Sequence, residues 1–174
     1  MAIITLTTDF GEKDHFAGAV KGAIYSEHPE VRIVDISHSV SPFNIPEAAY
    51  IIQNAYANFP KGTIHIIGID SELNQENKHI AIKLDEHYFI CANNGILSMI
   101  TSFILPEKMV EINIHNTIKT TFPVLDTFVK VACHIARGGT LEVIGKPIEK
   151  IKELKNLVPY VNERKHSLLV ALFI

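Results

Sequence analysis

The chain contains 174 residues, of which 47% are hydrophobic and 20% are charged, with a formal net charge of −3. This size and composition fit one compact domain, or one domain plus the start of another. Lysine and arginine total 16 against 19 aspartate and glutamate residues, so no basic surplus favours a nucleic-acid partner. No apolar run reaches the roughly 18 to 20 residues of a membrane-spanning helix, so we expect no membrane partner.

Two cysteines, Cys91 and Cys133, lie in apolar stretches without CxxC spacing, which predicts buried thiols rather than a disulfide framework or a zinc site. The histidines lack the HExxH and paired i, i+4 spacings of metal ligands, and no glycine-rich phosphate loop occurs. We therefore expect no metal and no cofactor. The start MAIITLTTDFG has no positively charged leader or cleavage site and predicts a mature cytoplasmic protein.

Apolar, β-rich runs alternate with helical patterns along the chain. The runs typical of strands cover residues 2–7, 31–36, 63–69, 79–84, 88–91 and 109–114. The helical patterns begin at residue 14, run from 46 to before 60, run from 95 to about 103, and cover 126–136. This alternation predicts an α/β three-layer sandwich with a central, largely parallel sheet buried on both faces.

Polar side chains gather in the loops that follow the predicted strands. In parallel sheets, ligands bind beyond the carboxyl ends of the strands, so these loops are the expected site. They contain Thr8, Asp9 and Asp14 after the first strand, residues 37–44 after the second, residues 70–77 after the third, and Asn93 with Asn94 after a later one.

Three loop residues each allow two interpretations. Asp9 precedes Gly11 at a strand end, where its carboxylate could accept both hydroxyls of a ribose or could open an Asx-turn. Asp14 is better placed as the N-cap of the following helix than as a ligand contact. Phe43 is a candidate stacking platform for a base, or an aromatic plug at the edge of the core. His38, between two serines, is expected to hold its own loop by hydrogen bonds rather than to shuttle protons.

Short segments in a fixed order resemble the N-terminal domain of the S-adenosylmethionine hydrolase (adenosine-forming) family, relatives of fluorinase and chlorinase. They cover about residues 2 to 150 and read Thr8-Asp9-Phe10-Gly11 with Asp14, Val34-Asp35-Ile36-Ser37-His38 with Pro42, Phe59-Pro60-Lys61-Gly62-Thr63, Asp70, Asn93-Asn94-Gly95-Ile96-Leu97 and Gly139-Thr140-Leu141-Glu142-Val143-Ile144-Gly145. The resemblance implies a seven-stranded α/β domain and a homotrimer. It also implies that water displaces methionine from S-adenosylmethionine and gives adenosine, without a cofactor.

The resemblance also implies roles for individual residues. Asp9 would hold the ribose hydroxyls, Asp14 would support the methionine end, and Phe43 would lie against the ribose and the sulfonium. Asn93 and Asn94 would shape the floor of the site. Thr121 would be a further substrate contact, and Asp70 and Asn77 occupy the catalytic positions.

Two positions depart from the family pattern of an Asp, Arg and His trio that activates the water. Asp70 matches the Asp, but Asn77 stands where the Arg belongs and Pro123 where the His belongs. An amide carries no fixed positive charge and proline has no side-chain base, so we expect impaired hydrolysis. The alternative is a non-catalytic module that binds adenosine or S-adenosylmethionine. A third hypothesis is a subunit-interface remnant without a ligand.

The family has a second domain, a C-terminal β-barrel. We expect residues 1–160 to form the N-terminal α/β domain. Residues 161–174 would be the linker and the start of the barrel domain, which is missing here. The apolar tail from Leu168 does not match the first barrel strand, and we expect a premature end by truncation or frameshift.

Overall fold

The fold is built on a seven-stranded mixed sheet in a computed structural model that describes residues 1–101, 104–114, 120–154, 160–161 and 167–168. The strand order is β2-β1-β3-β5-β4-β6-β7. The strands are β1 (Ile3–Thr8), β2 (Arg32–Ser37), β3 (Ile64–Gly68), β4 (His79–Leu84), β5 (His87–Ala92), β6 (Lys108–Ile112) and β7 (Gly145–Pro147). Strands β8 (Tyr160–Val161) and β9 (Ser167–Leu168) pair antiparallel in a separate two-stranded sheet.

The sheet is parallel on one side and antiparallel on the other. Strands β2, β1, β3 and β5 run parallel, whereas β4, β6 and β7 are joined by antiparallel pairings. Strand β1 lies between β2 and β3, so the chain order reverses beside it. A reversal of this kind leaves a crevice at the carboxyl ends of the strands, where ligands bind in α/β proteins.

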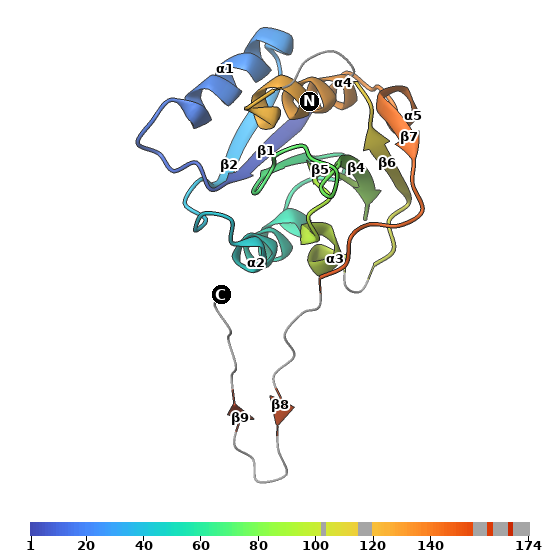
Figure 1. The fold of residues 1–174 in the computed structure, drawn as a ribbon. Coiled ribbons are helices and arrows are strands. Elements are labelled where there is room, and N and C mark those ends of the chain that lie inside the picture. Colours follow the sequence, from blue (N-terminus) through green and yellow to red (C-terminus); the bar gives the residue numbers. More distant parts are fainter. Residues whose placement is uncertain (102–103, 115–119, 155–159, 162–166, 169–174) are drawn as a thin grey trace.

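Helices cover both faces of the sheet and complete the predicted three-layer α/β sandwich (Figure 1). One face carries α1 (Phe16–Glu27) and α4 (Val129–Ala136), and the other carries α2 (Ile45–Ala55) and α3 (Ile96–Ile100). Each side has its own hydrophobic cluster, one with Leu6 and Phe128 and one with Ile52 and Phe89. Among the helices of the described residues, none has the length and apolar character needed to cross a bilayer.

Three elements differ from the sequence-based expectation. Strand β2 is not buried on both faces: it lies at the edge of the sheet, and Val34 is 37% exposed. The β4–β5 turn is shorter than predicted, because Asp85 and Glu86 both adopt positive φ and His87 already belongs to β5. The first three residues of the helix predicted over 126–136 belong to a π-helical turn, Val124–Phe128, so the α-helix itself begins at Val129; Gly138 follows it with a φ of +85°.

Other expectations either hold or fall outside the described residues. Cys91 and Cys133 are buried free thiols, as predicted, and burial raises the pKa of Cys133 to about 11. The short helix η1 (Tyr56–Asn58) continues α2, and α5 (Leu141–Ile144) precedes β7. The predicted helix end near Phe103 and the apolar tail beyond Leu168 lie outside the described residues.

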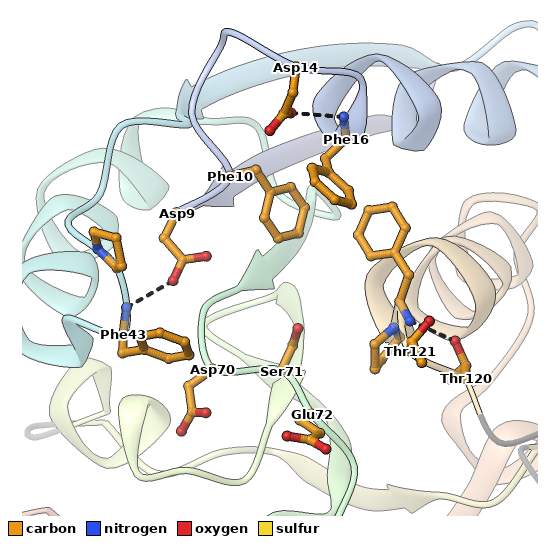
Figure 2. Close-up of a pocket in the computed structure, with 13 residues that line it drawn as sticks. Asp9, Phe10, Asp14, Phe16, Phe43, Asp70, Ser71, Glu72, Thr120 and Thr121 are labelled. Carbon is orange, nitrogen blue, oxygen red and sulfur yellow. Dashed lines mark hydrogen bonds between the residues drawn. The ribbon is translucent and has the colours of Figure 1, made fainter.

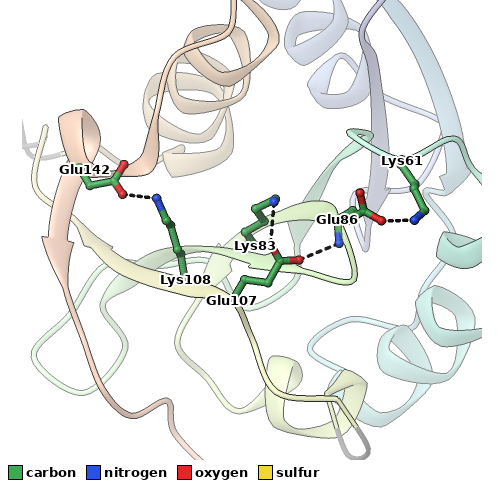
Figure 3. A network of polar contacts seen from close by, with 6 residues as sticks. All are labelled: Lys61, Lys83, Glu86, Glu107, Lys108 and Glu142. Atoms are coloured by element: carbon green, nitrogen blue, oxygen red, sulfur yellow. Dashed lines mark hydrogen bonds and ion pairs between the residues drawn. The ribbon is translucent and has the colours of Figure 1, made fainter.

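A row of exposed ion pairs lies along the β4–β5 hairpin and strand β6 (Figure 3). Lys83 Nζ lies 2.6 Å from Glu107, whose other oxygen accepts the backbone N–H of Glu86 at 3.0 Å. Lys108 pairs with Glu142 at 2.5 Å, and its hydrogen bond lowers the pKa of that carboxyl to about 2. Because these charges are exposed to solvent, the row adds little to stability.

Candidate functional site

A pocket of about 520 Å³ opens at the carboxyl ends of β1 and β3, beside the loop that follows β2 (Figure 2). This is the crevice that the strand order predicts. Its lining residues are Asp9, Phe10, Asp14, Phe16, Pro42, Phe43, Asp70, Ser71, Glu72, Thr120, Thr121, Phe122 and Pro123. Five residues predicted from the sequence as site residues therefore meet in one cavity, namely Asp9, Asp14, Phe43, Asp70 and Thr121.

Asp9 and Phe43 form the connection between the first two loops of the pocket. The Asp9 Oδ2 atom accepts the backbone N–H of Phe43 at 2.9 Å. Phe43 has a φ of +60°, which is rare for a bulky residue, and the residue is 72% exposed and lines the pocket. Burial raises the pKa of Asp9, and the charge of Asp70 raises it further, although the hydrogen bond from Phe43 opposes both. The carboxylate is thus held in place beside an aromatic surface.

Asp70 follows β3 and also has left-handed backbone, with a φ of +43°. The buried Asn94 side chain holds this turn: its Nδ2 donates to the carbonyl oxygens of Ile69 at 2.9 Å and Asp70 at 3.3 Å. Asn94 Oδ1 accepts the backbone N–H of Ile96 at 3.2 Å. Asn94 therefore supports the site from beneath and does not line the cavity.

Three phenylalanines form the wall of the pocket opposite Phe43. The ring centroids of Phe10 and Phe122 lie 5.4 Å apart, those of Phe16 and Phe122 lie 5.1 Å apart, and those of Phe10 and Phe16 lie 5.9 Å apart. Tilted and edge-to-face contacts at these distances are favourable. A Cβ atom on Gly68 would lie 3.2 Å from the Phe10 ring, so the end of β3 leaves little room for a side chain behind this wall.

The far side of the pocket comes from the segment before α4. Thr120 Oγ1 contacts Asp126 and accepts the backbone N–H of Phe122 at 2.9 Å, which fixes Thr121 at the rim. Pro123 is buried in this wall and offers neither a donor nor a base. Asp14 Oδ1 accepts the N–H of Phe16 at 3.1 Å, but the N-cap position itself is His15, one residue later than predicted.

The lining has an unusual charge balance. Asp9, Asp14, Asp70 and Glu72 contribute carboxylates, and no lysine, arginine or histidine is among the described lining residues. Together with the exposed ring of Phe43, this surface favours a ligand with a positive charge and an apolar body. It disfavours phosphate groups.

Two further predicted site residues lie away from the cavity lining. Asn77 Oδ1 accepts a hydrogen bond from the Lys152 ammonium at 3.1 Å, and Asn93 Oδ1 accepts one from the Lys152 backbone N–H at 2.8 Å. His38 holds its loop, as predicted, because Nδ1 lies 2.7 Å from Thr8 Oγ1 and Nε2 lies 3.1 Å from Asp35 Oδ1.

Several lining residues were not predicted as site residues. The helical pattern places Phe16 on the buried face of α1, yet 37% of it is exposed and it borders the pocket. The sequence could have indicated Phe10 as a site residue, since it lies directly between Asp9 and Gly11. For Glu72, the only indication in the sequence is its place two residues after Asp70. Phe122 and Thr120 lie where the sequence has no clear strand or helix pattern.

A family model described as the SAM hydroxide adenosyltransferase N-terminal domain matches residues 4–145. The chain belongs to this family. The match spans every described loop of the pocket and includes Asn77 and Pro123. The predicted family resemblance is therefore confirmed, as is the fold class.

Relatives of known name are longer than this chain. An (R)-S-adenosyl-L-methionine hydrolase from Methanocaldococcus jannaschii is 34% identical over 116 residues, which are 64% of this chain and 44% of the relative. The hydrolase of the same name from Salinispora tropica is 25% identical, and the match covers 91% of this chain and 62% of the relative. A solved structure of an uncharacterized conserved protein from Thermotoga maritima has a TM-score of 0.82 at 30% identity, covering 91% of this chain and 63% of that one.

Proposed function

We propose that this family member binds S-adenosyl-L-methionine in the Asp9–Phe43–Asp70 pocket and hydrolyses it to adenosine and L-methionine at a reduced rate. The observation that carries the proposal is the pocket lining itself, with four carboxylates, an exposed aromatic ring and no cation among the described members. A sulfonium ligand meets favourable charge and ring contacts there. Asp9 can accept both ribose hydroxyls, since a carboxylate offers about four lone-pair sites and Phe43 uses one.

In the proposed reaction, the oxygen of a water molecule bonds to C5′ of the ribose while the C5′–S bond breaks. The electron pair of that bond passes to sulfur, which becomes the neutral thioether of methionine, and the water proton passes to the Asp70 carboxylate. Positioning and exclusion of bulk water supply most of the acceleration in such a displacement. Asn77 lies outside the described cavity lining, and Pro123 has no base, so we expect slow turnover.

Incubation with S-adenosylmethionine in ¹⁸O water, followed by chromatography and mass spectrometry, tests the proposal. We expect adenosine labelled at its 5′ oxygen, released more slowly than roughly 1 per second. An Asp70→Asn variant purified in parallel controls for contaminating hydrolases. If calorimetry detects no S-adenosylmethionine binding and no adenosine forms, the proposal is wrong.

The second candidate is a binding module without turnover. It is favoured by Pro123 in the pocket wall, at the position where the family pattern has a base. Binding of adenosine and S-adenosylmethionine without any labelled product would support this candidate. From the resemblance we also propose a homotrimer, with a mass near three times 19.4 kDa by sedimentation. The buried free thiols fit a cytoplasmic location.

A further inference from the structure

The chain after β7 returns across the loop that carries Asp70. In this segment, residues 148–154, the Lys152 backbone N–H donates to Asn93 Oδ1 at 2.8 Å. The Lys152 ammonium donates to Asn77 Oδ1 at 3.1 Å. One residue thus joins two asparagines that belong to different loops, 59 and 75 positions earlier in the sequence.

Residues 148–154 are seated by further contacts on either side of Lys152. The Leu154 backbone N–H donates to Ser98 Oγ at 2.9 Å. The Leu154 side chain lies over Gly95, where a Cβ atom would come within 2.3 Å of Leu154 Cγ. Ile148 and Ile151 pack against the hydrophobic cluster under α3. The segment therefore has a defined path, from which the Lys152 side chain reaches Asn77.

The 69–78 loop, which joins β3 to β4, is fastened at both ends. Asn94 donates to the carbonyl oxygens of Ile69 and Asp70, and the Asn93 backbone N–H donates to the Lys78 carbonyl oxygen at 2.6 Å. Between these points, the loop contributes Asp70, Ser71 and Glu72 to the pocket. A residue with left-handed backbone such as Asp70 keeps that conformation only where its surroundings hold it. The hydrogen bond from Lys152 to Asn77 is a further restraint on the same loop, and it therefore affects where the loop places Asp70 in the pocket.

We propose that Lys152 is a positioning residue for the 69–78 loop, which deepens the proposed function and rests on it. Its ammonium and backbone N–H hold Asn77 to Asn93, and this keeps the loop in the conformation that presents Asp70 to the pocket. Lys152 is absent from the described lining, so it acts through the loop. Its loss therefore weakens the step that needs Asp70 and leaves adenosine binding at Asp9 and Phe43 nearly unchanged.

The test compares Lys152→Met with Lys152→Arg and with Lys150→Met, an exposed lysine in the same segment. Methionine keeps the apolar stem and the backbone donor but removes the charge, whereas arginine retains it. We expect Lys152→Met to speed hydrogen exchange at the amides of residues 72–78 by about threefold to tenfold, the effect of one lost hydrogen bond. We expect kcat for S-adenosylmethionine to fall by a similar factor while KM and adenosine affinity change less than about twofold. Lys152→Arg restores both readouts, and Lys150→Met alters neither.

Unchanged exchange and unchanged kcat in Lys152→Met would overturn the proposal, as would an equal effect of Lys150→Met. A fall in adenosine affinity that matches the fall in kcat would also overturn it, since that pattern places Lys152 in ligand binding. If the wild type neither binds nor hydrolyses S-adenosylmethionine, the proposed function is wrong. In that case, hydrogen exchange alone still decides whether Lys152 holds the loop.

Discussion

The Asp9 carboxylate accepts the backbone N–H of Phe43 at 2.9 Å, across 34 positions of the sequence. This contact ties the loop after β1 to the loop after β2 and stabilises the positive φ of Phe43. One substitution can separate this structural role of Asp9 from the ribose-binding role that we propose for it. Asp9 positions the aromatic ring, and it offers its other lone pairs to the ribose of the proposed ligand.

Asp9→Asn should weaken adenosine binding by about tenfold to a hundredfold, the range expected when hydrogen bonds to a charged group are lost. The Asn side-chain oxygen can still accept the Phe43 N–H, so the loop keeps its conformation. Asp9→Ala also removes that acceptor and should bind more weakly still. Isothermal titration calorimetry with adenosine measures both. Equal affinity in the wild type and in Asp9→Asn would rule out the diol-binding role.

Adenosine affinity should fall as the pH is lowered, because the protonated Asp9 side chain is a poorer acceptor for two hydroxyls. Burial raises the pKa of Asp9 above its ordinary value of 3.8, so the loss should begin at a higher pH than for a free aspartate. Titrations between pH 7 and pH 4 measure the change. The Asp9→Asn variant provides the control, since its affinity should lack this dependence. A flat wild-type profile would contradict the assignment.

Phe43→Leu should reduce affinity for S-adenosylmethionine by about threefold to thirtyfold, the range of a cation–π contact. Leucine keeps an apolar side chain at this exposed position but presents no aromatic face to a sulfonium. Adenosine carries no charge, so its affinity should fall less. Calorimetry measures the affinity of Phe43→Leu for S-adenosylmethionine and for adenosine, and the difference between the two losses separates cation–π attraction from simple packing. Equal losses for both ligands would show that Phe43 does not recognise the charge.

The convergence of Asp9, Phe43 and Asp70 could be predicted from the sequence. Each follows a strand of the parallel part of the sheet, and parallel strands bring their carboxyl ends to the same edge. Strand and helix patterns were sufficient to place all three. The aromatic wall was harder to predict, because Phe10 and Phe122 meet only through the packing of the segment before α4 on β1.

The environment of Asn77 and Asn93 could not be predicted in this way. Both side chains are engaged by Lys152, whose segment has no periodic pattern that would place it over those loops. The exposure of Val34 has a similar explanation. Apolar content indicates a strand, but it does not show whether that strand lies in the centre or at the edge of a sheet.

Gly68→Ala should destabilise the protein by about 1 to 3 kcal/mol, as expected for overpacking. The new Cβ atom would lie 2.9 Å from Val124 Cγ2 and 3.1 Å from the Thr8 methyl group, beneath the Phe10 ring. Gly22→Ala in α1 is the matched control, since no atom outside its own helix turn lies within 4 Å of the added carbon. That variant should gain about 0.5 to 1 kcal/mol from helix propensity. Urea unfolding measures both, and equal effects would contradict the close approach at Gly68.

His65 should make the protein less stable in acid. Its Nδ1 lies 2.7 Å from Thr5 Oγ1, and its Nε2 lies 3.2 Å from His87 Nδ1. Burial, together with the neighbouring His87, lowers the pKa of His65 from 6.5 to about 3. Between pH 6.5 and about pH 3, His65 is therefore protonated in the unfolded chain but stays neutral in the folded protein. Stability should fall as the pH drops through this window, by at most about 1.4 kcal/mol per unit from this group.

His65→Gln tests this dependence, because glutamine can hydrogen-bond to Thr5 and does not titrate. The variant should lose about 1 to 3 kcal/mol at pH 7 from imperfect replacement of buried hydrogen bonds. Its free energy of unfolding should then vary less steeply between pH 6.5 and pH 4 than that of the wild type. Parallel slopes for the wild type and His65→Gln would show that this buried imidazole is not what sensitises the fold to acid.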